Sequence, residues 1–291
     1  MKTEVYNEIM KVIHSYTGSN VDPRRNCTTL LQERFPDIPH YTLSSIYSLD
    51  YQRRMKRNHQ RHARAAKDLY RRYNEIIQTT NKPGALLQIS DQIDLSPSLL
   101  ARMILDQHYE RQAEDGDPAA TKSAITKLMK DTTLIKDSRL AYEIYLCILH
   151  DDQYGPITDT IKHSLGQEYE LRLLRKIQEL NLPFRDEELM RKHGYDKTPD
   201  VKLEVPIAVD GFIVNWIESK ALFGDEEGHK TYMKEQYLSY WNRFGPGLVI
   251  YWFGYLDYLE QFSDKKLIIR EDFPSDITFM DPKSIKPTLI T

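Results

Sequence analysis

The chain has 291 residues, of which 40% are hydrophobic and 29% charged; this balance excludes a disordered or fibrous protein and is typical of a soluble globular one. The longest apolar run, residues 247–256, covers about half of a membrane span, so we expect no transmembrane helix and no membrane partner. Two cysteines, Cys27 and Cys147, provide neither a disulfide framework nor a zinc site, which indicates a reducing compartment.

The formal net charge of −3 argues against a nucleic-acid binder, but the charge is unevenly distributed. Residues 1–80 are expected to form a helical region whose second helix starts near Thr42 and carries a basic stripe between Tyr51 and Arg72. Five residues of this stripe are candidates for contacts with nucleic-acid phosphates: Arg53, Arg54, Lys56, Arg57 and Arg61. The stripe is equally compatible with a solvated helix face or a nuclear-import signal.

Residues 81–152 are expected to form a second helical region. One helix is predicted at residues 85–93, and another begins at Pro97, with Ser96 as its N-cap. This is the helix-turn-helix pattern, in which the second helix can enter a major groove, and Arg102 is the candidate base-reading residue. A weak internal similarity predicts a first such unit in residues 1–80, although many helix pairs with this spacing touch no DNA.

Short polar segments separate these helices. A linker is predicted at residues 81–84 and a loop at residues 112–118. Residues 151–156 are the expected boundary to a third region, residues 153–291, in which helices alternate with β-like runs. The chain is therefore predicted to have an all-α region followed by an α/β domain with a small mixed sheet.

The most informative stretch of the third region is a predicted β-hairpin. Residues 201–209 and 212–220 are expected to pair around a two-residue turn at Asp210 and Gly211. With that turn, Leu203 would pair near Glu218. Asp200 would then lie at the same end of the hairpin as Glu218 and Lys220.

Asp200, Glu218 and Lys220 have the chemistry of a phosphodiesterase site. Glu218 and Lys220 are two residues apart, so they face the same side of a strand. Two carboxylates and the backbone carbonyl of Ser219 offer the oxygen ligands that Mg²⁺ prefers, and the ammonium can orient water or stabilise developing charge. The alternative is an ordinary Glu218–Lys220 ion pair at a strand end.

Two flanking helices supply further candidates. In the helix at residues 165–180, Glu170 is expected on the core side, where a metal would be its cation; a capping glutamate or one at the rim of the core is the alternative. In a helix at residues 230–243, Gln236 and Tyr240 share one face and, with Lys234, could contact nucleic acid; a plain amphipathic helix is the alternative. The acidic segment 224–228 is expected to be a mobile loop.

Three motifs carry a family resemblance: Thr198-Pro199-Asp200, the stretch 216–220 (WIESK) and Gly245-Pro246-Gly247. In this order they resemble the TPD-motif nucleases of the PD-(D/E)xK type. The resemblance implies a restriction-endonuclease-like, Holliday-junction-resolvase-like domain and DNA cleavage that depends on Mg²⁺, with Mn²⁺ as a possible substitute.

The resemblance also implies catalytic roles for Asp200, Glu218, Lys220 and Glu170. Beyond the site, it implies binding to codanin-1, residence in nucleus and cytoplasm, and a role in red-cell maturation. The alternative function is a catalytically silent nuclease fold that serves as an adaptor for DNA or for codanin-1.

Overall fold

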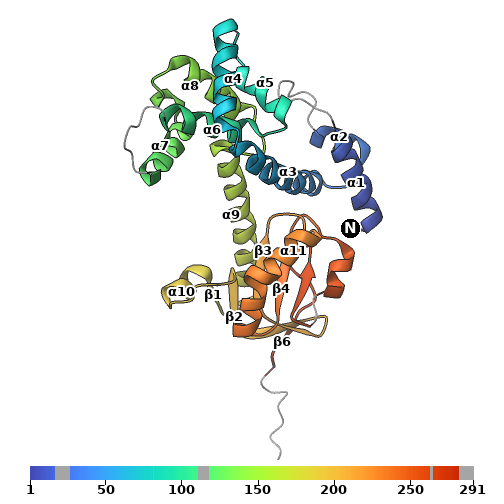
Figure 1. Ribbon diagram of the computed structural model, residues 1–291. Helices are drawn as coiled ribbons and strands as arrows, with labels where there is room; N and C mark the ends of the chain where they lie inside the picture. The colour runs from blue at the N-terminus through green and yellow to red at the C-terminus, as the bar shows by residue number, and fades with distance from the viewer. Residues whose placement is uncertain (17–26, 81, 111–117, 263–264, 282–291) are drawn as a thin grey trace, which may run out of the picture. The chain divides into compact units, whose positions relative to one another are not determined.

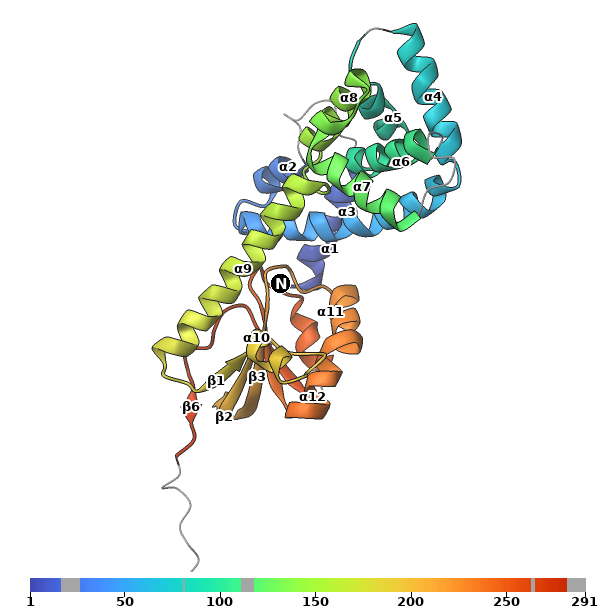
Figure 2. The same ribbon diagram turned by 90° about the vertical axis from the view of Figure 1, so that its left-hand side faces the viewer.

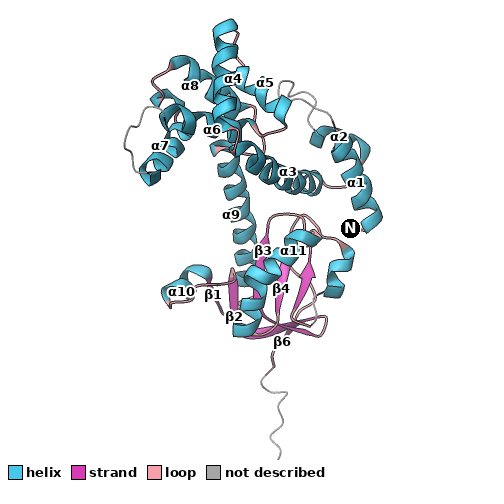
Figure 3. Cartoon of the chain, in the orientation of Figure 1, coloured by secondary structure: helices cyan, strands magenta, loops and turns pink. Residues whose placement is uncertain are grey.

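The chain forms two compact units in the computed structural model (Figure 1). The described residues are 1–16, 27–80, 82–110, 118–262 and 265–281. The helical unit comprises residues 13–36 and 47–163, and the sheet unit comprises residues 1–12, 37–46 and 164–291. A helical N-terminal region followed by a mixed α/β domain is confirmed (Figure 3). The predicted boundaries near residues 80 and 152 stay predictions.

The first part of the chain is a succession of helices. They are α1 (Thr3–Ser15), α2 (Cys27–Arg34), α3 (His40–Ala63), α4 (Ala66–Thr79), α5 (Ala85–Ile93), α6 (Pro97–Glu110), α7 (Pro118–Lys130), the 3₁₀ turn η1 (Thr132–Leu134) and α8 (Ser138–Leu149). No helix among the described residues is long and apolar enough to cross a membrane.

The helix pair predicted after residue 84 is present as α5 and α6. The Oγ of Ser96 accepts the Leu99 N–H at 3.3 Å, so Ser96 caps α6 as predicted. In contrast, the basic stripe does not lie on a single helix, because α3 ends at Ala63 and α4 begins at Ala66. The predicted linker and loop fall partly outside the described residues, which omit Asn81 and residues 111–117.

Among its described residues, the sheet unit contains six strands. They are β1 (Phe184–Asp186), β2 (Val201–Val209), β3 (Phe212–Lys220), β4 (Gly247–Tyr251), β5 (Leu267–Arg270) and β6 (Thr278–Phe279). The order is β1-β2-β3-β4-β5, with β6 also paired to β2. The pairs β1–β2, β2–β3 and β2–β6 are antiparallel, whereas β3–β4 and β4–β5 are parallel.

The predicted hairpin is present with its predicted ends. Asp210 and Gly211 have φ values of 50° and 76°, the left-handed conformations that a tight hairpin turn requires. Near the turn Val209 pairs with Phe212, but the register shifts before the far end, where Val201 pairs with Ile217. The expected pairing of Leu203 near Glu218 is therefore wrong.

A bulge in β2 causes this shift. Between Lys202 and Ile207, the alternation of buried and exposed side chains is interrupted at Glu204 and Val205, which are both exposed. Pro206 follows and has no N–H to donate to the partner strand. The bulge adds three residues to β2. Extending the register in which Val201 pairs with Ile217 by one residue therefore places Asp200 opposite Glu218.

The two faces of the sheet are covered by different helices (Figure 2). On one face, Leu173 and Ile177 of α9 (Pro156–Glu179) join the hydrophobic core with Val201 and Ile217. The other face is covered by three consecutive segments: α11 (Glu226–Tyr232), the π-helical turn η2 (Met233–Tyr237) and α12 (Leu238–Phe244). Trp216 lies on this second face, with its ring centroid 5.3 Å from that of Tyr240.

Two shorter helices complete this unit: α10 (Glu187–Lys192) and the 3₁₀ helix η3 (Asp257–Phe262). In the acidic segment 224–228, expected to be a mobile loop, residues 226–228 instead form the start of α11. Asp225 is buried, and its carboxylate accepts the N–H of Gly228 at 2.9 Å, which caps the helix.

Candidate active site

Asp200 and Glu218 are held together by reciprocal backbone hydrogen bonds. The N–H of Ser219 donates to Asp200 Oδ2 at 2.7 Å, and the N–H of Asp200 donates to Glu218 Oε2 at 3.3 Å. Each carboxylate is thus fixed by the backbone of the other's strand. Glu218 is 3% exposed and Asp200 is half-buried, so both lie in a site with little access to bulk water.

Lys220 completes this cluster from β3. Its Nζ donates to Glu218 Oε1 at 2.5 Å and to Gln236 Oε1 at 3.1 Å, and it lies 4.7 Å from the ring centroid of Tyr232. The ammonium is therefore held by an anion, an amide and an aromatic face. The predicted convergence of Asp200, Glu218 and Lys220 is what the structure shows.

The electrostatics of the cluster follow from burial. Loss of solvation, followed by repulsion from Glu218, raises the pKa of Asp200 well above its ordinary value of 3.8. Burial likewise raises the pKa of Glu218, although the Lys220 ammonium opposes this effect. The pKa of Lys220 is raised because the two carboxylates outweigh the cost of burying its ammonium. When both carboxyls are ionised, two carboxylates facing one ammonium leave the site with an excess of negative charge.

The donor set of the cluster suits a hard divalent cation. Successive carbonyls of a strand point to opposite neighbours, and the Lys220 carbonyl accepts the Trp252 N–H on the β4 side. The Ser219 carbonyl therefore points toward Asp200. No group of three or more His, Cys, Asp or Glu side chains among the described residues has the geometry of a metal site. Two carboxylates and one carbonyl still fit Mg²⁺, which usually retains several waters.

Glu170 does not occupy the position predicted for it. Tyr169, Leu173 and Ile177 form the core-facing side of α9, so Glu170 is exposed and the expected core-side orientation is wrong. The negative charge of Glu170 nevertheless contributes to raising the pKa of Asp200, so Glu170 lies within electrostatic range of the cluster.

The predicted residues of the later helix separate into two groups. Gln236, in η2, reaches Lys220, and Tyr240, in α12, is buried against Trp216 beside the carboxylates. Lys234 is exposed to solvent. The π-helical turn at η2 is a conformation found frequently at functional sites, and here it carries the amide that contacts the ammonium.

The segment Gly245-Pro246-Gly247 is attached to β3 through Trp216. The indole Nε1 donates to the Gly245 carbonyl at 2.8 Å. Gly245 has a φ of 84°, which other residues rarely adopt, and Gly247 lies against the indole, where a Cβ would have no room. These contacts position β4 beside β3 and thereby fix the strand that carries Glu218.

The residues of the helical unit that are predicted to contact nucleic acid are distant in sequence from this cluster. Lys56, Arg57 and Arg61 are exposed on α3. Arg53 and Arg54 are half-buried, and Arg54 pairs with Asp94 at 3.5 Å. In α6, Arg102 donates to the Thr126 hydroxyl at 3.2 Å. Their contact with nucleic acid stays a prediction.

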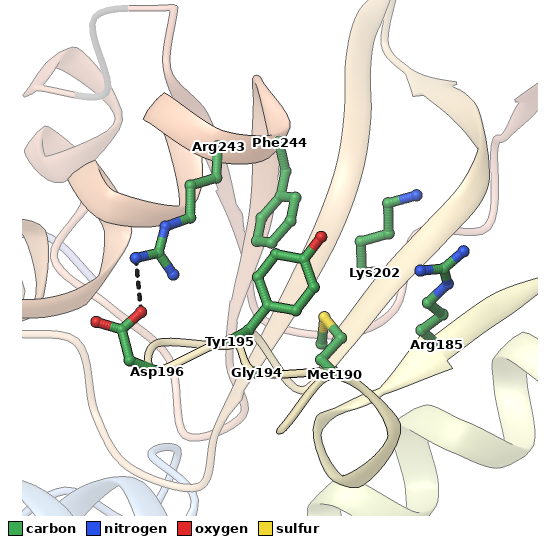
Figure 4. A pocket seen from close by; sticks show the side chains of 8 residues that line it. All are labelled: Arg185, Met190, Gly194, Tyr195, Asp196, Lys202, Arg243 and Phe244. Atoms are coloured by element: carbon green, nitrogen blue, oxygen red, sulfur yellow. Dashed lines mark ion pairs between the residues drawn. The ribbon is translucent and has the colours of Figure 1, made fainter. Parts of the chain in front are cut away.

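The sequence did not reveal several residues around the cluster. Tyr232 contacts Lys220, and Glu187, at the start of α10, adds negative charge near Glu218. Tyr232 precedes Gln236 by four residues, a spacing that could have indicated it. A cavity beside β2, lined by Tyr195, Lys202 and residues of three other segments, had no sequence signal (Figure 4).

Comparisons with known proteins agree with one another. Residues 136–273 match a family described as "Protein of unknown function TPD sequence-motif". The chain is 44% identical over 277 residues to the CDAN1-interacting nuclease 1 of Xenopus laevis, covering 94% of this chain and 89% of that protein. It is 42% identical over 274 residues to the human protein of the same name, covering 94% and 95% respectively. No solved structure shows a significant match.

Proposed function

Because the chain belongs to the CDAN1-interacting nuclease 1 family, which carries the TPD sequence motif, we propose that it is a divalent-metal-dependent nuclease that hydrolyses phosphodiester bonds in DNA. One observation carries the proposal. Asp200 and Glu218 are bound to each other's backbone at the end of a hairpin, with the Lys220 ammonium 2.5 Å from Glu218. Ion pairing alone does not explain two buried carboxylates around one cation.

Asp200, Glu218 and the Ser219 carbonyl would hold the metal. When bound, Mg²⁺ or Mn²⁺ would polarise the scissile phosphate and lower the pKa of a coordinated water. The carboxylates are preorganised for this task, since the N–H groups of Ser219 and Asp200 already fix their orientation. A bound divalent cation would offset the repulsion from Glu218 that helps to raise the pKa of Asp200.

Lys220 would act on the reacting groups themselves. Its ammonium can donate to the attacking water or to a phosphate oxygen as negative charge develops there. Gln236 and Tyr232 hold the ammonium in place, so they are positioning residues. Glu170, although exposed, would modulate the charge of the site from α9.

The order of the strands supports assignment of the sheet unit to the PD-(D/E)xK type. An antiparallel hairpin carries the acidic residues and the lysine, and β4 and β5 follow in parallel. The helical unit, through the exposed Lys56, Arg57 and Arg61, would add phosphate contacts. From the name of the relatives we extend codanin-1 binding to this chain. Residence in nucleus and cytoplasm and a role in erythroid maturation remain predictions of the resemblance.

A cleavage assay tests the catalytic proposal. Labelled single-stranded, duplex and branched DNA are incubated with the protein and Mg²⁺ or Mn²⁺, and in parallel with Asp200→Asn and Lys220→Met. We expect cleavage by the parent and a loss of more than about a hundredfold in both variants. The exposed Asp272, paired with Arg172, provides the control Asp272→Asn, which should retain activity.

The other outcomes are equally informative. Cleavage that persists in both variants would come from a contaminant. A parent that cuts none of the substrates with either metal would contradict the nuclease proposal and favour the adaptor function.

A further inference from the structure

The sheet unit contains a cavity of about 490 Å³ beside β2 (Figure 4). This volume lies within the range of small-ligand sites, about 300–1,000 Å³. The cavity has three cationic side chains and two aromatic rings in its lining, contributed by Arg185, Lys202, Arg243, Tyr195 and Phe244. None of these residues belongs to the Asp200–Glu218–Lys220 cluster.

The cationic groups are held in place by carboxylates but stay accessible. Lys202 pairs with Glu204 at 3.0 Å, and Arg185 pairs with the same carboxylate. Arg243 pairs with Asp196 at 2.6 Å. The cations exceed these carboxylates by one, and a quarter or more of each cationic side chain is exposed. Exposed ion pairs contribute little free energy, so an entering phosphate can share or replace these carboxylates.

The aromatic rings add an apolar stacking surface to the cationic lining of the cavity. Tyr195 and Phe244 lie with ring centroids 5.8 Å apart and an interplanar angle of 49°. Figure 4 shows the Tyr195 ring between Arg243 on one side and Lys202 with Arg185 on the other. Tyr195 is 37% exposed, so its ring is available to a ligand. Aromatic rings beside guanidinium and ammonium groups are what a nucleotide requires, since its base stacks and its phosphate pairs.

The cavity is next to the proposed catalytic cluster. Lys202 follows Asp200 by two residues, so both face the same side of the sheet, and Lys202 pairs with Trp216 of β3 as well as with Arg185 of β1. Two strand residues span about 7 Å. A single substrate strand can therefore place one nucleotide in the cavity and present a neighbouring phosphate at Asp200.

We propose that this cavity binds one nucleotide, with its base on Tyr195 and Phe244 and its phosphate on Lys202, Arg185 and Arg243. The ligand is a nucleotide of the substrate strand near the scissile bond. This identity rests on the proposed nuclease function. A free nucleoside monophosphate has the same chemistry and would occupy the same cavity. A base that stacks on these rings must be unpaired. The cavity therefore binds nucleotides from single-stranded segments or from frayed duplex ends.

Binding without metal tests this inference separately from catalysis. The affinity of the full chain for a short fluorescent single-stranded oligonucleotide is measured by anisotropy in EDTA, with deoxyadenosine monophosphate as competitor. Tyr195→Ala and Lys202→Gln should each weaken binding about tenfold, whereas Tyr195→Phe, which keeps the ring, should bind like the parent. Lys176→Gln, which removes another exposed and paired lysine of this unit, is the matched control.

Each outcome has one meaning. If the mononucleotide competes with the oligonucleotide in the parent but not in Tyr195→Ala, the cavity accepts a free nucleotide. If oligonucleotide binding depends on Tyr195 but the mononucleotide does not compete, the cavity binds only a nucleotide within a strand. Oligonucleotide binding unaffected by both Tyr195→Ala and Lys202→Gln overturns the inference. If the parent cleaves no substrate, the proposed nuclease function is overturned. The metal-free binding results would still show whether the cavity binds a nucleotide.

Discussion

Gly247 lies directly against the indole of Trp216, so closely that a Cβ at residue 247 would be 2.1 Å from Cε2 of the ring. The two residues face each other across β3 and β4, since the neighbouring Ile217 pairs with Leu248. The indole is also anchored through Nε1 to Gly245. No rotamer change at residue 247 can relieve this overlap, because the added atom is the Cβ itself.

Gly247→Ala should therefore destabilise the protein by about 1–3 kcal/mol, because the indole or β4 must move. Cleavage should fall as well, since β3 carries Glu218. Urea unfolding measures the first effect and an activity assay the second. Gly166→Ala is the control, because a Cβ there meets nothing within 4 Å and alanine favours the helix by about 0.5–1 kcal/mol. Equal stabilities of the two variants would contradict this account of Gly247.

Asp200→Asn should raise the stability of the metal-free protein at pH 7 by about 1–3 kcal/mol while abolishing cleavage. The pKa of Asp200 is raised in the folded state, so its ionised form penalises folding above that pKa. The difference between the variant and the parent should shrink as the pH falls below 3.8, where the carboxyl is protonated in both the folded and the unfolded state. Thermal unfolding of both proteins across this pH range measures the difference in stability.

Added Mg²⁺ should reverse the order of the parent and Asp200→Asn. Binding to the folded parent adds stability that the variant, lacking one carboxylate ligand, does not gain. A stability gain of equal size in both proteins would show that Asp200 is not a ligand.

Lys220→Met should have the opposite effect on metal-free stability. Removing the ammonium leaves two buried carboxylates without their cation, which should cost about 3 kcal/mol at pH 7. Lowering the pH should restore part of this loss, because protonation neutralises the carboxyls. Lys230→Met is the matched control: Lys230 forms an exposed pair with Glu226 in α11, and its loss should cost less than about 0.5 kcal/mol. Equal losses in both variants would contradict a special role for Lys220.

His229 should make the fold sensitive to mild acid. Its side chain is 2% exposed, its Nδ1 lies 3.0 Å from the Tyr251 hydroxyl, and its ring centroid lies 6.0 Å from that of Tyr237. Burial lowers the pKa of His229 to about 4. The unfolded chain, with a pKa near 6.5, binds more protons between these values, so stability should fall by up to about 3 kcal/mol as the pH drops from 6.5 to 4.

The contribution of His229 can be isolated with His229→Gln, whose side chain does not titrate. The difference in unfolding free energy between parent and variant should change with pH only in this window. The exposed His193 provides the control His193→Gln. A constant difference between the parent and His229→Gln from pH 7 to pH 4 would contradict the prediction.

The exposed basic residues of α3 predict salt-sensitive DNA binding. Replacing Lys56, Arg57 and Arg61 together with alanine should weaken duplex binding and reduce the slope of log affinity against log salt by about 0.9 for each lost phosphate contact. Titrations at several salt concentrations measure this slope. The same number of exposed lysines on α7, Lys122, Lys127 and Lys130, forms the control triple. Identical slopes for the two triples would argue against a specific role for α3.

The hairpin and the convergence of Asp200, Glu218 and Lys220 could be predicted because their signals are local. Asp210 and Gly211 specify the turn, and the two-residue spacing of Glu218 and Lys220 specifies a common face. Pro206 was the one sign of the bulge, but a proline does not state how many residues a strand will gain. The opposition of Asp200 and Glu218 thus came from a feature that the sequence did not specify.

Other features depended on tertiary packing. Glu170 was placed on the wrong face because several nearby leucines allow two helix phases, and packing of Tyr169 against Trp252 and Phe253 selects one. The nucleotide-sized cavity draws residues from β1, β2, α12 and the segment after α10, which lie far apart in the sequence. A local pattern cannot reveal such a site.

The β2 bulge has a practical consequence for protein engineering. Because the bulge changes the register between the turn and the carboxylates, the tip of the hairpin and the end that carries Asp200 and Glu218 are paired independently of each other. An epitope tag or a fluorescent peptide grafted between Asp210 and Gly211 would lengthen the tip without altering the alignment of Asp200 with Glu218. A deletion within residues 204–206 would instead slide one carboxylate past the other and dismantle the site.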